Sequence, residues 1–221
     1  MSADSTSAVS PGDHSTTFTG LAAWACRQRM RVSWLLNLAI LALLALSGHS
    51  WSQDSWLDGA LEMTGLACLI LCTLGRIWAS VHVNGRKDRE LVTDGPYSMV
   101  RNPLYVFSAV GALGIGLASE NLAVLALLLL AFAFYYPLVV RGEEQVLAGL
   151  FPDTFPAYAA RVPRFVPRPG LFRENAVVPV DARRFRRSLA DASVFIWLDF
   201  GLQGLEWLRG AGLLPTLFVV P

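Results

Sequence analysis

Apolar residues gather along the chain in four stretches, at about residues 32–47, 60–83, 103–119 and 122–140. A helix needs roughly 17–25 mostly apolar residues to cross a bilayer. Only the short polar link at residues 118–121 separates the last two stretches, so we expect them to form an antiparallel helical hairpin. The pattern predicts an all-α fold: a polytopic membrane helix bundle with four transmembrane helices.

Basic residues occur on alternate sides of these stretches. They precede the first, separate the second from the third, and follow the fourth: Arg27, Arg29 and Arg31; Arg86, Lys87, Arg89 and Arg101; and Arg141. The links at 48–59 and 118–121 contain no lysine or arginine. Since lysine and arginine in short loops resist translocation, the alternation predicts an integral protein of the inner, cytoplasmic membrane with a cytoplasmic N-terminus.

The two ends of the chain differ from this apolar core. Residues 1–26 begin with a Ser/Thr/Gly-rich segment that we expect to be a disordered tail. Five prolines between positions 152 and 169 predict a small folded cytoplasmic cap, which completes a core at residues 27–170. In residues 171–221 a basic linker precedes an apolar segment. Asp199 and Glu206 there share a helix face, which favours an interfacial helix and leaves a fifth crossing open.

Composition agrees with a membrane protein and argues against two other classes. The chain is 54% hydrophobic and only 16% charged, whereas soluble domains carry about a quarter charged residues. Its formal net charge of +1 gives no basic excess for binding nucleic acid. Cys68 and Cys72 lie one helical turn apart with no histidine at ligand spacing, so we expect no metal site and assign them to packing. Membrane lipids are the expected surroundings.

Three polar segments lie on the predicted cytoplasmic side: GPYSMVRNPLY at 95–105, RGEE at 141–144, and the proline-rich cap. Because the third and fourth helices form a hairpin, the start of one and the end of the other should line one pocket. Ionisable residues at the membrane edge are costly and indicate function. Glu143 and Glu144 point about 100° apart on a helix, so one can face a ligand while the other pairs with an arginine. The sequence does not choose between them.

From about residue 91 to 167 the chain resembles the isoprenylcysteine carboxyl methyltransferase family and the related phospholipid N-methyltransferases. The segments LVTDGPY, RNPLY, EEQVL, FPDTFPAY and ARVPRFVP follow the family order and spacing. Three positions depart from the pattern. Asn102 replaces the usual histidine, Pro152 a glycine and Phe155 the first of two tyrosines. An asparagine keeps one hydrogen-bond donor and one acceptor, so we interpret Asn102 as a tolerated substitute.

The resemblance implies S-adenosyl-L-methionine as methyl donor, with a lipophilic acceptor (a carboxylate, amine, thiol or phenol) entering from the bilayer. It implies catalytic roles for Arg101, Glu144 and Arg161. Residues implied to contact the cofactor are Tyr97, Asn102, Pro103, Tyr105, Gly114, Gly116, Glu143, Glu144 and Tyr158. Arg164 is expected to close the cap with Tyr158. The sequence identifies neither the acceptor nor the oligomeric state.

Three alternatives remain open at this point. Gly114 and Gly116 are equally consistent with close packing of two helices. The helical core is also compatible with an NADPH-dependent oxidoreductase similar to membrane sterol reductases. A non-catalytic membrane scaffold would use the same polar residues to anchor helices. Ligand binding distinguishes these functions. A methyltransferase should bind S-adenosylmethionine, an oxidoreductase NADPH, and a scaffold neither.

Overall fold

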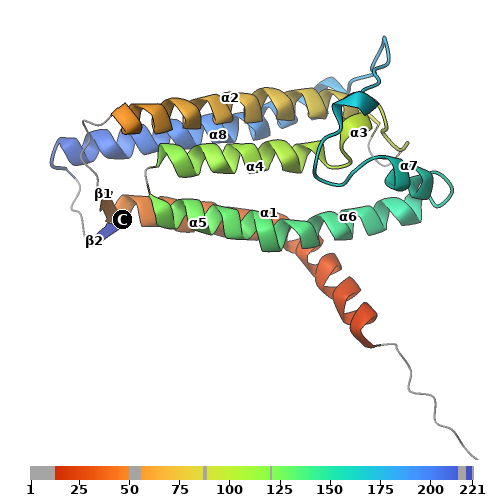
Figure 1. Ribbon diagram of the computed structural model, residues 1–221, viewed down its shortest axis with the longest axis horizontal. Helices are drawn as coiled ribbons and strands as arrows, with labels where there is room; N and C mark the ends of the chain where they lie inside the picture. The colour runs from red at the N-terminus through yellow and green to blue at the C-terminus, as the bar shows by residue number, and fades with distance from the viewer. Residues whose placement is uncertain (1–12, 50–55, 87–88, 120, 214–217, 221) are drawn as a thin grey trace, which may run out of the picture.

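The computed structural model describes residues 13–49, 56–86, 89–119, 121–213 and 218–220. Its long helices run side by side in an elongated bundle, and the short helices gather at one end (Figure 1). We call this end the cap end. The long elements are α1 (Asp13–Leu46), α2 (Trp56–Val83), α4 (Pro103–Ala118), α5 (Leu122–Leu130), the π-helical turn η1 (Ala131–Tyr135), α6 (Tyr136–Leu150) and α8 (Ala182–Gly210).

The short elements occupy both ends of the bundle. The cap end holds α3 (Pro96–Met99), α7 (Phe155–Arg161) and the 3-10 turn η2 (Pro169–Leu171). At the opposite end the strands β1 (Ser47–His49) and β2 (Phe218–Val220) pair in parallel. The helical class that the sequence predicts is confirmed, with this three-residue pairing as an addition.

Local sequence explains where the hairpin helices begin. Pro103 occupies the first turn of α4, where its missing N–H breaks no helical hydrogen bond. Asn121 caps α5, because its side-chain oxygen accepts hydrogen bonds from the backbone N–H groups of Ala123 and Val124 at 3.0 and 3.1 Å. The predicted antiparallel hairpin is therefore present, and α6 continues to Leu150, past the apolar stretch.

Two helices are long and apolar enough to cross a membrane, at residues 59–83 and 122–150. Large apolar side chains on their outer faces are exposed, including Ile70, Leu74 and Phe134. A soluble protein rarely presents such continuous apolar surface. The protein is thus a membrane-associated helical bundle with two candidate spanning helices.

The core of the bundle lies between α2 and α4, the helix pair with the most extensive contact. Its buried apolar residues come from five helices: Ile40, Leu69, Ala112, Ile115, Val124, Leu128 and Leu202. Glycines let α2 and α4 approach closely. A Cβ added to Gly114 would lie 2.8 Å from the carbonyl oxygen of Gly65, so neither position has room for a side chain.

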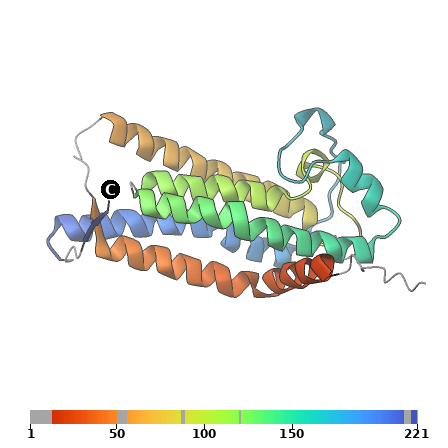
Figure 2. The same ribbon diagram turned by 60° about the horizontal axis from the view of Figure 1, so that its bottom comes forward.

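Two segments differ from the sequence expectation. Helix α1 begins at Asp13, inside the region expected to be a disordered tail; residues 1–12 lie outside the described residues. Helix α8, for which the sequence favoured an interfacial helix and left a fifth crossing open, runs alongside α2 and α4 in both views of the bundle (Figures 1 and 2). Asp199 and Leu202 are accordingly buried. The side chain of Glu206 lies outside the described residues. Apolar contacts along α8 explain why it packs within the bundle.

Candidate active site

The hairpin brings the start of α4 against the last turns of α6. Asn102 immediately precedes α4, and its Nδ2 donates a hydrogen bond to Oε1 of Glu144 at 3.1 Å. Both residues are buried. Two positions 42 residues apart in the sequence therefore share one polar centre, as the motif order predicted.

Glu144 is the centre of this polar cluster. Its Oε2 accepts hydrogen bonds from Nε and Nη2 of Arg164 at 3.0 and 2.7 Å. Nε of Arg101 lies 3.3 Å from Oε1, at ion-pair distance. The carboxylate is only 6% exposed, and a buried charge is costly unless paired and hydrogen-bonded. Two guanidinium groups and one amide supply that pairing. We call Arg101, Asn102, Glu144 and Arg164 the Glu144 cluster.

Backbone contacts hold the end of the cap against the start of α4. The N–H of Arg101 donates to the carbonyl of Pro163 at 2.9 Å. Nδ2 of Asn102 also donates to the carbonyl of Arg164 at 3.3 Å, and Nη1 of Arg101 donates to the carbonyl of Ala159 at 3.4 Å. The VPR sequence of the motif is thus fixed beside RNP by main-chain groups.

One polar atom in the cluster has no hydrogen-bond partner. Nε of Arg101 is buried, and its ion pair with Glu144 is not aligned as a hydrogen bond. Unpaired buried donors are rare in folded proteins, because each loses its hydration without replacement. The side chain of Arg164 is 36% exposed at the rim. The cluster therefore combines a spare buried donor with an arginine that reaches solvent.

Two tyrosines close the cap over this cluster. The hydroxyl of Tyr158 donates to the carbonyl oxygen of Tyr97 at 2.8 Å, and Tyr158 packs with Phe155 and Val162. Burial raises the pKa of Tyr158 above its usual range, against the opposing effect of Arg101. Burial and the neighbouring Tyr158 likewise raise the pKa of Tyr97. Both phenols stay protonated near neutral pH, so they act as hydrogen-bonding groups rather than as bases.

An aromatic group lies next to the cluster, toward the middle of the bundle. The ring centres of Tyr105 and Tyr136 are 5.7 Å apart, and Tyr136 stacks on Phe132 at 4.2 Å. Tyr136 directly follows the π turn η1. π turns inside α-helices are rare and frequently occur at functional sites. Here the turn places an aromatic wall between the polar cap end and the apolar helices.

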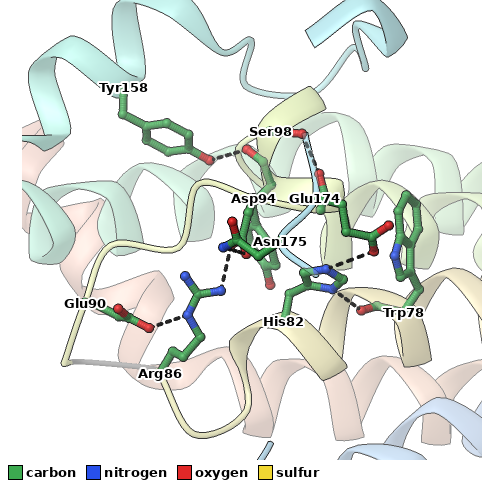
Figure 3. A network of polar contacts seen from close by, with 11 residues as sticks. Trp78, His82, Arg86, Glu90, Asp94, Ser98, Tyr158, Glu174 and Asn175 are labelled. Atoms are coloured by element: carbon green, nitrogen blue, oxygen red, sulfur yellow. Dashed lines mark hydrogen bonds and ion pairs between the residues drawn. The ribbon is translucent and has the colours of Figure 1, made fainter. Parts of the chain in front are cut away.

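The GPY loop rests on a buried histidine. Gly95 has φ +57°, and a Cβ added there would lie 2.2 Å from Nε2 of His82. Nδ1 of His82 lies 3.0 Å from the carbonyl oxygen of Trp78, and its Nε2 lies 3.4 Å from Oε1 of Glu174 (Figure 3). Only glycine fits this position, both because of its backbone conformation and because the imidazole occupies the side-chain space.

A second network ties the same loop to the segment after η2. Asp94 accepts from Nη1 of Arg86 at 2.6 Å and from Nδ2 of Asn175 at 2.7 Å. Oγ of Ser98 accepts from the N–H of Arg173 at 3.0 Å, and the N–H of Gly95 donates to the carbonyl of Arg173 at 2.7 Å. Figure 3 shows these side chains converging from α2, the loop and the 173–175 segment. The loop is therefore held on both sides.

The structure brings together most of the residues that sequence reasoning selected. Arg101, Asn102 and Glu144 belong to the Glu144 cluster, and Pro103 directly follows Asn102. Tyr158 binds the backbone of Tyr97 in the cap, and the N–H of Tyr105 donates to the carbonyl of Asn102. Between the two acids, Glu144 is the buried one and Glu143 is only half-buried.

Other selected residues lie elsewhere. Arg161 is exposed on α7, and Arg164 pairs with Glu144 instead. Gly114 lies twelve residues along α4 from Asn102, about 18 Å away, and packs against α2. Gly116 packs against Leu125 of α5. The structure does not bring either glycine to the cluster.

Sequence reasoning missed the residues that support the GPY loop, namely His82, Arg86, Glu174 and Asn175. Asp94 was part of the motif, but nothing in the sequence indicated its partners. The described residues contain no group of three or more His, Cys, Asp or Glu side chains suited to a metal ion. A surface hollow lined by Gly85, Arg89 and Asp181 lies at the start of α8, outside the Glu144 cluster.

Comparison with known proteins gives the same assignment as the motifs. Residues 63–154 match the phospholipid methyltransferase family, and this range includes Asn102 and Glu144. Protein-S-isoprenylcysteine O-methyltransferase of Schizosaccharomyces pombe is 35% identical over 81 residues, which are 37% of this chain and 34% of that protein. No solved structure matches the chain significantly.

Two bacterial relatives match over most of their length. The nickel-cobalt-cadmium resistance protein NccN of Alcaligenes xylosoxydans xylosoxydans is 39% identical over 188 residues, 85% of this chain and 88% of that protein. The cobalt-zinc-cadmium resistance protein CzcN of Cupriavidus metallidurans is 38% identical over 211 residues, 96% of this chain and 97% of that protein. The chain therefore belongs to the same family as NccN and CzcN, and its residues 63–154 match the phospholipid methyltransferase family.

Proposed function

We propose that the protein transfers a methyl group from S-adenosylmethionine to a lipophilic acceptor at the cytoplasmic face of the membrane. The observation that carries this proposal is the Glu144 cluster. Three motif segments that are distant in sequence meet at one buried carboxylate, which two arginines and Asn102 hold in place.

The residues of the cluster fit the polar groups of this cofactor. The buried Nε of Arg101 lacks a hydrogen-bond partner, and guanidinium groups suit the carboxylate of the cofactor's methionine part. Glu144 and Asn102 offer oxygen acceptors for its ammonium group or ribose hydroxyls. Arg164, which reaches solvent, is the partner that Glu144 would exchange when the cofactor binds. When bound, S-adenosylmethionine supplies a methyl group already activated by its sulfonium.

The surroundings of the cluster suit an acceptor that enters from the bilayer. Tyr105 and Tyr136 form an aromatic wall next to the polar residues, and α2 and α5 expose apolar side chains outward. Such a site orients the acceptor and keeps water away from the methyl group. The proposed reaction requires no titrating group at position 102. An asparagine there can orient both a bound ligand and the neighbouring carboxylate through hydrogen bonds.

In the proposed orientation α1, α2, α4 and the continuous α5–α6 helix cross the membrane, α8 runs alongside them as a fifth crossing, and the cap end lies in the cytoplasm. The basic residues support it. Four of them contact the GPY loop or the start of α4 and end of α6 at the cap end: Arg86, Arg101, Arg164 and Arg173. Lysine and arginine near helix ends favour the cytoplasmic side.

The names of the two bacterial relatives connect this family with resistance to cobalt, cadmium, nickel and zinc. We place the proposed methyl transfer in that context: the acceptor is a membrane component whose methylation changes how the envelope tolerates these ions. A deletion strain should lose metal tolerance, and a Glu144→Ala copy should not restore it.

Calorimetry on the purified full chain tests the donor. Wild type should bind S-adenosylmethionine, and Glu144→Ala, alone or with Glu143→Ala, should weaken binding at least about 100-fold, because it leaves the guanidinium groups of Arg101 and Arg164 without the carboxylate that both contact. Glu143→Ala alone is the matched control and should stay within about threefold of wild type. Unchanged affinity in the double variant, or binding of NADPH instead, would reject the proposal.

The acceptor can be sought with the same variants. Membranes incubated with methyl-labelled S-adenosylmethionine should gain label in the lipid extract when wild type is present and lose it with Glu144→Ala. Absence of label despite cofactor binding would move the acceptor to a non-lipid component.

A further inference from the structure

Arg76 is a charged residue inside the apolar span at residues 59–83. It lies seven residues before the end of α2 at Val83, about 10 Å along the helix axis from the cap end. Arginine keeps its charge in any protein environment. Charged residues within membrane segments are rare, face the protein interior and usually mark a ligand or ion site.

The partners of Arg76 do not balance its charge. Nη1 donates to Oγ of Ser108 on α4, whose own proton goes to the carbonyl of Leu104 at 2.7 Å. The guanidinium carbon lies 5.6 Å from the ring centre of Phe195 on α8. Nε is buried without a hydrogen-bond partner, and no carboxylate of the described residues lies within ion-pair distance. The half-buried Arg76 side chain thus keeps one buried N–H group, at Nε, without a partner among the described residues.

Arg76 lies between a close junction of three helices and the cap. One turn deeper, a Cβ at Gly111 would lie 2.5 Å from Sγ of Cys72 and 2.8 Å from the ring of Phe195, so the three helices meet there. On the cap side, burial and Tyr158 raise the pKa of Tyr97, and the charge of Arg76 opposes this rise. Arg76 therefore lies near Tyr97. Arg76 therefore lies above a closed helix junction and below α3.

We propose that Arg76 binds the anionic head, a carboxylate or phosphate, of the lipophilic acceptor between α2, α4 and α8. That this anion is the methyl acceptor rests on the proposed function. That Arg76 binds an anion does not depend on it. A planar guanidinium with free N–H groups suits the two oxygens of such a head. In this arrangement the arginines of the Glu144 cluster bind the methyl donor, and Arg76 binds the acceptor.

Matched amphiphiles test this in the wild type. The full chain in phosphatidylcholine nanodiscs is exposed to oleate or oleyl alcohol, and to dioleoyl phosphatidate or dioleoylglycerol, and bound ligand is counted by native mass spectrometry. We expect each anionic member to bind at least about tenfold better than its neutral match. Equal binding of both members in both pairs would overturn the proposal, whatever the variants do.

Variants assign the preference to Arg76. Arg76→Gln should remove it and Arg76→Lys should retain part of it. Arg89→Gln, which removes an exposed arginine just beyond α2, should leave it unchanged. A preference that survives in folded Arg76→Gln would overturn the assignment. Acetate or inorganic phosphate that competes as well as the lipids would overturn the lipophilic class. Binding of S-adenosylmethionine is measured in the same samples: its absence in wild type rejects the proposed function and leaves the anion site standing.

Discussion

At its start α4 meets a buried carboxylate bound by two guanidinium groups, whereas at Gly114 it meets the backbone of Gly65 and the apolar side chains of Cys68 and Leu69 on α2. At the first end, ionic contacts fix the side chains, and a charged ligand can compete for such contacts. At the second end, direct backbone approach between Gly65 and Gly114 leaves no space. The comparison shows that the two ends of one helix have different roles: the first offers polar contacts for which a ligand can compete, and the second sets the distance between α2 and α4.

Gly95→Ala should have the largest effect on the free energy of unfolding. It forces a side chain onto a residue with φ +57° and into the ring of His82, at a cost of about 3 kcal/mol. The loop that carries Tyr97 must then move, so affinity for S-adenosylmethionine should fall at least about tenfold. Calorimetry and thermal unfolding in detergent measure both.

Gly149→Ala is the control for this substitution. A Cβ there meets nothing within 4 Å, and alanine is the better helix former, so stability should stay equal or rise slightly. If Gly95→Ala kept full affinity, the GPY loop would not position the donor site.

Gly114→Ala should separate stability from binding. Its Cβ would lie 2.8 Å from the carbonyl of Gly65, so α2 and α4 must separate, at a cost of about 2 kcal/mol. Affinity for S-adenosylmethionine should stay within about twofold, because the position is about 18 Å from Asn102. Gly201→Ala, on an open surface of α8, serves as control. If Gly114→Ala lost affinity for S-adenosylmethionine but kept its stability, Gly114 would have to be assigned to the cofactor site.

Tyr158→Phe should have a smaller effect at the cap. It removes the hydrogen bond to the carbonyl of Tyr97 and leaves that oxygen without its partner, which costs about 1.5 kcal/mol. Chemical unfolding of the purified protein measures the difference. A neutral result would show that water replaces the hydroxyl.

The same tyrosine predicts a pH dependence. Its pKa is higher in the folded protein than in the unfolded chain, chiefly because of burial. The unfolded chain therefore loses this proton first, and the stabilisation is full below about pH 10 and declines above it. Wild type should lose stability between about pH 9 and 11 more steeply than Tyr158→Phe. Parallel curves would contradict the assignment.

Asn121→Ala should have the smallest effect, at the end of the hairpin away from the cap. It removes the cap of two N–H groups at the start of α5, worth about 1 kcal/mol. Asn121→Asp keeps an acceptor and should restore most of the stability. Methyl transfer should be unchanged in both. A loss of activity here would mean that the hairpin turn affects the Glu144 cluster.

Much of the fold could be predicted because apolar length and turn chemistry are local. The 118–121 link and the proline at position 103 predict the hairpin, and the hairpin predicts that Asn102 and Glu144 meet. The beginning of α1 and the packing of α8 could not be predicted in this way. The packing of α8 depends on contacts with other helices, such as the burial of Leu202 against the core, which outweigh local polarity. The described contacts give no such explanation for the start of α1 at Asp13.

The site shows the same division. The motif order identified the segments, but choosing Arg164 over Arg161 required the path of the chain after α7. His82 carried no signal, because a histidine at a helix end is ordinary until Gly95 lies against it. Arg76 was also passed over, although an arginine within an apolar stretch is visible in the sequence.

The choice between the two acids follows from η1. A π turn holds about one residue more than an α turn, so counting 100° per residue through Ala131–Tyr135 errs by about one position. A straight helix of the same sequence would aim Glu143 where Glu144 now lies. Relatives that lack one residue in this turn should therefore keep the acid that aligns with Glu144. An alignment gap in the turn would then mean that the acidic side chain still points in the same direction, not that the site has been lost.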